Sequence, residues 1–211
     1  MKEYFSLGGE CVTEKIIEKS RFITTSKRVV GEEQAKAFIA EISAKYADAT
    51  HNCYAYICDS LGNFMRFSDD GEPQGTAGMP ILEVIKNKNL VECAVVVTRY
   101  FGGIKLGAGG LLRAYSGCAS ENLQSAQKVL YTPCAENRYT VDYPLVDSIL
   151  RFLNGTECNI ISTDYENRVT FTVAVKSADL SKFESELQNA LNGRLQIQRV
   201  GEYFFPFPIK N

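Results

Sequence analysis

The fold is decided by the stretch Val95-Val96-Val97-Thr98-Arg99-Tyr100-Phe101-Gly102-Gly103-Ile104-Lys105-Leu106-Gly107-Ala108-Gly109-Gly110-Leu111-Leu112. Its apolar start predicts a central strand, its glycine-dense middle a loop, and the residues from Gly107 to about Val129 a long helix. The side chains expected to face inward from this helix are Leu111, Leu112, Tyr115, Cys118 and Ala119. A strand that leads through a glycine loop into a helix directs free backbone N–H groups and the positive helix end at one spot.

This arrangement predicts an anion site. Lys105 and Arg99 add mobile and planar cationic groups, and Tyr100 or Phe101 offers a ring on which a nucleobase can stack. The candidate RNA- or anion-binding residues are Arg99, Tyr100, Gly102, Gly103, Lys105, Gly107 and Arg113. The spacing matches neither a P-loop nor the dinucleotide-binding fingerprint. The alternative is that the glycines only make a tight turn and let the helix approach the sheet.

Upstream, residues 68–78 are rich in turn formers and predict a loop that carries Asp69, Asp70 and Glu72. These acids and His51 form a second candidate site, either for a divalent metal or as solvated acids in a turn. A zinc site of His51 with Cys53 and Cys58 is not expected, because Cys58 falls on the opposite face of a strand from the other two. No metal and no cofactor is therefore assigned, and the catalytic residues stay unknown.

Around these loops the first half alternates strands and helices. A hairpin is expected at 12–17 and 22–30, a helix after Gly31, strands at 53–58 and 64–67, and a helix up to Asn87 with Pro80 in its first turn.

The pattern of the second half predicts a strand at 139–143, a helix at 145–153, a hairpin at 158–162 and 169–175, a helix at 179–191 and a strand at 195–200. This order, βαββαβ, predicts a ferredoxin-like domain. Pro133 and the polar residues 135–137 mark the expected boundary, which gives domains of residues 1–134 and 135–211. Phe171 shares the apolar face of its strand, which argues against an RNA-recognition motif with open-face aromatics.

Composition limits the class of protein. The 211 residues suit one or two domains at ~150 residues each. The net charge of −2 argues against a protein that grips nucleic acid with its whole surface, but it leaves room for a local basic patch. The seven cysteines predict free, buried thiols in a reducing compartment. With no secretory signal and no run of the ~20 apolar residues that a spanning helix needs, we expect a cytoplasmic protein without membrane contact.

Three separated motifs carry a family resemblance. They are Ala49-Thr50-His51-Asn52-Cys53-Tyr54-Ala55-Tyr56, then Ser68-Asp69-Asp70-Gly71-Glu72-Pro73 with Gly75-Thr76-Ala77-Gly78, and Thr98-Arg99-Tyr100-Phe101-Gly102-Gly103-Ile104-Lys105-Leu106-Gly107. Together they resemble the IMPACT family, whose bacterial members are called YigZ-type. The resemblance implies an α+β protein. Its N-terminal α/β sandwich would be like domain 2 of ribosomal protein S5, and its ferredoxin-like C-terminal domain would be similar to those of elongation factor G.

The same resemblance suggests a setting in translation. Eukaryotic members restrain the Gcn2 kinase by competing for the Gcn1 protein, but they carry an RWD domain that has no counterpart in this sequence, so a Gcn1-type partner is not expected.

Three hypotheses follow. The first is a non-enzymatic regulator of translation or stress response that binds RNA, the ribosome or a ribosome-associated protein through residues 99–110. The second is a hydrolase or transferase for a nucleotide-like or phosphorylated small molecule, with His51 as acid or base and the acids of residues 69–72 on a metal. The third is a surface that only binds protein.

Overall fold

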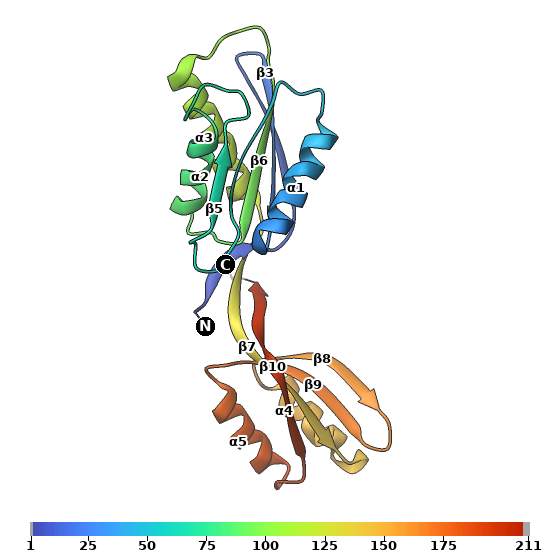
Figure 1. Cartoon of the computed structure of the whole chain (residues 1–211). Coiled ribbons are helices and arrows are strands. Elements are labelled where there is room, and N and C mark those ends of the chain that lie inside the picture. Colours follow the sequence, from blue (N-terminus) through green and yellow to red (C-terminus); the bar gives the residue numbers. More distant parts are fainter. Residues whose placement is uncertain (1, 209–211) are drawn as a thin grey trace. The chain divides into compact units, whose positions relative to one another are not determined.

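The computed structural model describes residues 2–208, and the chain divides into two compact units (Figure 1). One contains Tyr4–Leu130 and is called the N-terminal unit below. The other contains Tyr131–Phe207 and is called the C-terminal unit. Each unit has strands and helices of its own, which confirms the predicted α+β class.

The N-terminal unit is built on an antiparallel sheet with the strand order β2-β3-β6-β4-β5. Its strands are β2 (Cys11–Ile17), β3 (Ser20–Arg28), β4 (His51–Ile57), β5 (Met65–Ser68) and β6 (Cys93–Tyr100). The central strand is β6, in which Val95, Val96 and Val97 are fully buried. This confirms the predicted central strand and the predicted β2–β3 hairpin.

Helices cover both faces of this sheet. Helix α1 (Gly31–Lys45) packs on one face, whereas α2 (Gly78–Asn87) and α3 (Gly107–Ser125) pack on the other (Figure 1). Alternate β6 side chains point to opposite faces, so Val95 and Val97 lie in the core under α2 and α3, and Val96 lies under α1. Leu112 of α3, expected to face inward, is 47% exposed, because the ~100° rotation per residue places it at the edge of the buried face that contains Leu111 and Tyr115.

The end of this unit departs from the expected pattern. Helix α3 ends at Ser125, and β7 (Lys128–Val141) follows in place of the last predicted helical turn. Strand β1 (Tyr4–Leu7), which the sequence did not reveal, pairs with β7, a strand that begins in this unit. Pro133 does not interrupt β7: its ladder with β9 starts at Cys134, so the missing N–H of Pro133 costs no bond there.

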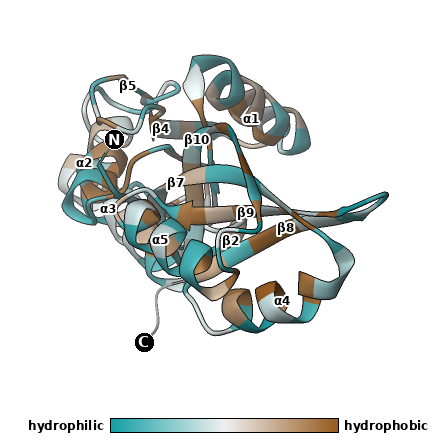
Figure 2. Cartoon of the chain, turned by 90° about the horizontal axis from the view of Figure 1, so that it is seen from below, coloured by the Kyte–Doolittle hydropathy of each residue, from teal (hydrophilic) through white to brown (hydrophobic). Residues whose placement is uncertain are grey.

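The C-terminal unit has the predicted βαββαβ order. After β7 come a short 3₁₀ turn, η1 (Tyr143–Leu145), then α4 (Val146–Asn154), β8 (Cys158–Tyr165), β9 (Val169–Lys176), α5 (Leu180–Ala190) and β10 (Gln196–Pro208). The sheet order is β10-β7-β9-β8. Phe171 of β9 is fully buried in the core beneath the helices, as predicted. Figure 2 shows hydrophilic and hydrophobic residues along both α4 and α5, as expected for helices with one buried face.

All seven cysteines are free thiols, as predicted, and Cys11 and Cys158 are only partly buried. Burial raises the pKa of the Cys53 thiol to about 12, so this thiol is neutral at physiological pH. Between residues 2 and 208, no helix combines the length and apolar character needed to cross a membrane.

Candidate functional site

Both sequence-predicted loops lie at the same end of the N-terminal sheet. In the β4–β6 ladder His51 pairs with Arg99, which places the start of β4 beside the end of β6. Strand β5 runs antiparallel to β4, so the acidic loop that follows Ser68 emerges at this end too. The turn between β2 and β3 and the loop after β6 are also found here (Figure 1). The acidic and glycine loops, whose separation the sequence left open, are therefore neighbours.

A buried ion pair joins the end of β6 to the acidic loop. The Arg99 guanidinium donates from Nη1 to Oε1 of Glu72 at 2.7 Å, and the two residues are 5% and 8% exposed. The Tyr115 hydroxyl donates to the same carboxylate oxygen at 2.7 Å. Burial raises the pKa of the Tyr115 phenol, so it stays protonated and remains a donor.

The same guanidinium is fixed on its other sides. Its Nη2 donates to Oγ of Ser20 at 3.2 Å, and its central carbon lies 5.5 Å from the ring centres of both Phe22 and Phe101. Arg99 therefore holds together β6, the β2–β3 turn and the acidic loop. A buried charge with this many partners fixes the segments that it contacts relative to one another.

His51 lies next to this pair with a defined orientation. Its Nδ1 is 2.7 Å from the carbonyl oxygen of Asp70, and because a carbonyl only accepts, Nδ1 carries the proton and donates. Its Nε2 lies 3.9 Å from Oε2 of Glu72. The Nδ1 bond to Asp70 and the approach of Nε2 to Glu72 place the His51 ring between two residues of the acidic loop.

The remaining acids of the loop bind the protein's own backbone. The Asp69 carboxylate accepts hydrogen bonds from the N–H groups of Gly75, Ala77 and Gly78, at 2.8, 3.0 and 2.8 Å, and so caps the start of α2. Asp70 accepts from the N–H of Asn52 at 2.5 Å. The second hypothesis gave Asp69, Asp70 and Glu72 a metal. The structure corrects it, because each carboxylate has protein partners and residues 2–208 hold no group of three or more metal-ligating acids, histidines or cysteines.

Replacement of Asp69 by alanine is expected to lower the free energy of unfolding by about 1–3 kcal/mol, because three backbone N–H groups lose their acceptor. Asp69→Asn keeps one carbonyl oxygen and is expected to lose about half as much. Urea unfolding followed by circular dichroism measures both. An Asp69→Ala protein as stable as the wild type would show that water replaces this cap without cost.

The glycine loop is fastened to the sheet at its first residues. The N–H of Phe101 donates to Oγ1 of Thr50 at 3.0 Å, and the N–H of Gly102 donates to Oγ of Ser20 at 3.2 Å. A Cβ on Gly102 would lie 2.0 Å from the backbone of Lys19, so only glycine fits here. Gly103 and Gly107 have φ of +86° and +69°, values that L-residues rarely adopt.

The start of α3 is the cationic part of the site, with Lys105 two residues before the helix and Arg113 in its second turn. Lys105 and Arg113 are exposed, and within residues 2–208 neither forms an ion pair. No acid lies in the first turn of α3, whereas α1 has Glu32 and Glu33 in its first turn and the Asp69 carboxylate accepts from the N–H groups at the start of α2. The Arg113 guanidinium reaches back along the helix, with Nη1 3.7 Å from where a Gly109 Cβ would lie.

Two predicted contact residues are therefore in unexpected places. Arg99 is buried against Glu72 and cannot be the exposed phosphate contact that the sequence suggested. The Tyr100 hydroxyl donates to Asp48 at 2.8 Å and its ring is only partly exposed, so it offers little open surface for stacking. The exposed ring is that of Phe101, at 47%.

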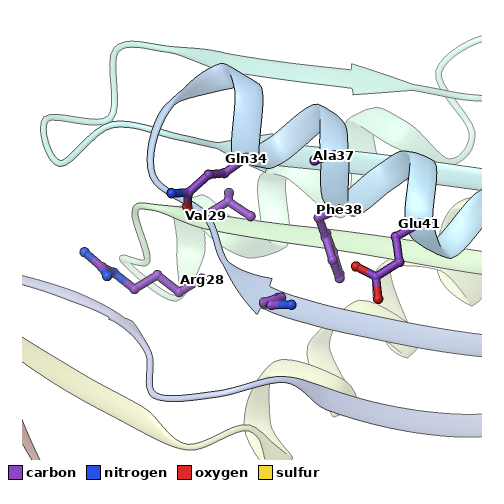
Figure 3. A pocket seen from close by; sticks show the side chains of 7 residues that line it. Arg28, Val29, Gln34, Ala37, Phe38 and Glu41 are labelled. Carbon is purple, nitrogen blue, oxygen red and sulfur yellow. The ribbon is translucent and has the colours of Figure 1, made fainter.

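A separate hollow of about 240 Å³ lies in the N-terminal unit between α1 and the end of β3 (Figure 3). Figure 3 shows Gln34, Phe38 and Glu41 of α1 on one side of it and Arg28 on the other. None of the sequence-predicted site residues lines this hollow.

Two protein-family models and several known proteins match this chain. The family model described as Impact N-terminal domain matches residues 18–123, and the model described as a domain of unknown function, DUF1949, matches residues 140–194. The IMPACT family member YvyE of Bacillus subtilis is 37% identical over 198 residues, which are 94% of this chain and 91% of that protein.

Two further relatives differ in extent. The IMPACT family member YigZ of Escherichia coli is 37% identical over 188 residues, or 88% of this chain and 92% of that protein. Protein IMPACT of Mus musculus is 38% identical over 94 residues, which are 42% of this chain and 29% of that protein. A crystal structure of a hypothetical protein aligns with a TM-score of 0.63 at 34% identity, covering 95% of this chain and 98% of the other.

Proposed function

The chain belongs to the IMPACT family, and from this premise we propose that it is a non-enzymatic regulator associated with translation that binds RNA phosphate on the ribosome. The contact surface is the loop after β6 together with the first two turns of α3. The regulatory setting rests on the family resemblance, in which eukaryotic members regulate translation. The binding mode rests on the chemistry of the loop.

One observation carries the proposal: Lys105 and Arg113 are exposed cations without an ion-pair partner among residues 2–208, and they flank a helix start that has no acid of its own. Cations near the positive N-terminal end of a helix are repelled by that end. A bound anion therefore stabilises both the cations and the helix end. RNA phosphate suits the site because it accepts hydrogen bonds from guanidinium, ammonium and backbone N–H groups alike.

Other features of the loop and of the chain support the same interpretation, that this loop binds RNA phosphate. The hydrogen bonds from Phe101 and Gly102 to Thr50 and Ser20 fix the first residues of the loop before any ligand arrives, which reduces the entropy lost on binding. A chain with a net charge of −2 does not attract RNA over its whole surface, so contact is confined to this patch. The expected interaction is local, of moderate affinity and sensitive to salt.

The test is co-sedimentation of the purified protein with ribosomes at low salt. Lys105→Ala combined with Arg113→Ala is expected to weaken binding about a hundredfold or more, because charge-assisted hydrogen bonds contribute roughly 1.5–3 kcal/mol each. The matched control is Lys36→Ala with Arg66→Ala, which removes one lysine and one arginine from exposed positions on α1 and β5. Equal binding by both double variants and the wild type would overturn the proposal.

A further inference from the structure

The ring of Phe101 is an exposed aromatic surface that the fold holds in place. It is 47% exposed, although its backbone N–H is bound by Thr50 and the next N–H by Ser20. The buried Arg99 guanidinium lies 5.5 Å from the ring centre. This cation supports the ring from the protein side, so the exposed part of the ring faces solvent in a fixed orientation.

From this geometry we infer that the loop takes single-stranded RNA, with an unpaired base stacked on Phe101 while the neighbouring phosphates contact Lys105 and Arg113. The inference deepens the proposed function and rests on it. A base in a duplex is stacked on its own neighbours and cannot reach a ring at the protein surface, whereas a base in a single strand can.

The distances along the chain fit one short strand. Lys105 follows Phe101 by four residues, so their Cα atoms are at most about 14 Å apart. Gly102 and Gly103 lie between them and carry no side chains that would cover the ring. Ile104 is 37% exposed and adds apolar surface beside the aromatic platform.

The inference assigns the stacking role to Phe101 in place of Tyr100. Each ring has a guanidinium near its centre, but Tyr100 is only partly exposed and its hydroxyl is bound to Asp48, whereas Phe101 is 47% exposed. Because the Arg99 charge is already balanced by Glu72, it supports the Phe101 ring without competing for RNA phosphate. Phosphate contact and base contact are therefore carried by different residues, which can be tested separately.

The experiment measures fluorescence anisotropy with a labelled single-stranded RNA and with a duplex of the same length. Phe101→Leu is expected to weaken single-strand binding about tenfold and to leave duplex binding unchanged, because base stacking on an aromatic ring is lost. Phe101→Trp should restore it. Phe64→Leu, which alters a ring 64% exposed in the turn before β5, is the matched control and should bind like the wild type. Thermal unfolding of each variant shows that it is folded.

The outcomes separate the two proposals. If the double variant of Lys105 and Arg113 loses binding but Phe101→Leu does not, the stacking inference is wrong and the proposed function stands. If Phe101→Leu weakens single-strand and duplex binding equally, the preference for an unpaired base is wrong. Absence of RNA binding by the wild type overturns both and leaves the loop as a protein-binding surface.

Discussion

Replacement of Arg99 by alanine is expected to lower the free energy of unfolding by about 3–5 kcal/mol, which is a large part of the stability of a small domain. The loss is large because the Glu72 carboxylate, with 4% of its side chain exposed, is left without its cation. The ties to Ser20 and the contacts with Phe22 and Phe101 are lost as well. Urea unfolding of the purified variant measures the change.

An exposed ion pair of the same chemistry provides the control. Arg21 and Glu14 form two hydrogen bonds of 2.8 Å, but both side chains are nearly half exposed. Arg21→Ala is therefore expected to lower the free energy of unfolding far less than Arg99→Ala, because water and salt screen an exposed pair. In the double variant Arg99→Met with Glu72→Gln, neither charge is left alone, and the combined loss is expected to be smaller than the sum of the single losses. Strictly additive losses would contradict a coupled pair.

Replacement of Gly102 by alanine is the second large effect. The new Cβ would lie 2.0 Å from the carbonyl carbon and oxygen of Lys19 and 2.5 Å from the backbone nitrogen of Ser20, so the backbone of one segment has to move. We expect a loss of about 3 kcal/mol in the free energy of unfolding, together with weaker RNA binding, because the loop no longer sits on the β2–β3 turn.

Gly117→Ala is the matched control for this change. Gly117 lies in the middle of α3 with nothing within 4 Å of an added Cβ. Alanine has the higher helix propensity, so this variant is expected to be more stable by about 0.5–1 kcal/mol. If Gly102→Ala were as stable as Gly117→Ala, the loop would not be fastened as described.

The sequence predicted which strands and helices form better than it predicted which side chains contact one another. Strand β6, the glycine loop and α3 follow from an apolar run, glycines and helical spacing, each of which is a local signal. The burial of Arg99 could also have been predicted: it continues the alternation of Val95 and Val97, whose side chains face α2 and α3. Its exposed position was assumed because an arginine beside glycines suggests an anion site.

Other parts of the site could not be predicted from one sequence. The contact between Glu72 and Arg99 joins two segments that are 27 residues apart, and no periodicity links a loop residue to a strand. The role of Ser20 depends on the close approach of the β2–β3 turn to Gly102, which is a tertiary contact. Strand β1 is only four residues long and has too little pattern to detect.

The most direct test of the central claim is the salt dependence of RNA binding. If Lys105 and Arg113 each neutralise a phosphate of a single strand, the slope of log K against log salt becomes shallower by about 1.4 when both are replaced by alanine. The Lys36→Ala, Arg66→Ala control should keep the wild-type slope. A Lys105→Ala, Arg113→Ala variant that binds with the same slope as the wild type would contradict the claim that this loop binds RNA phosphate.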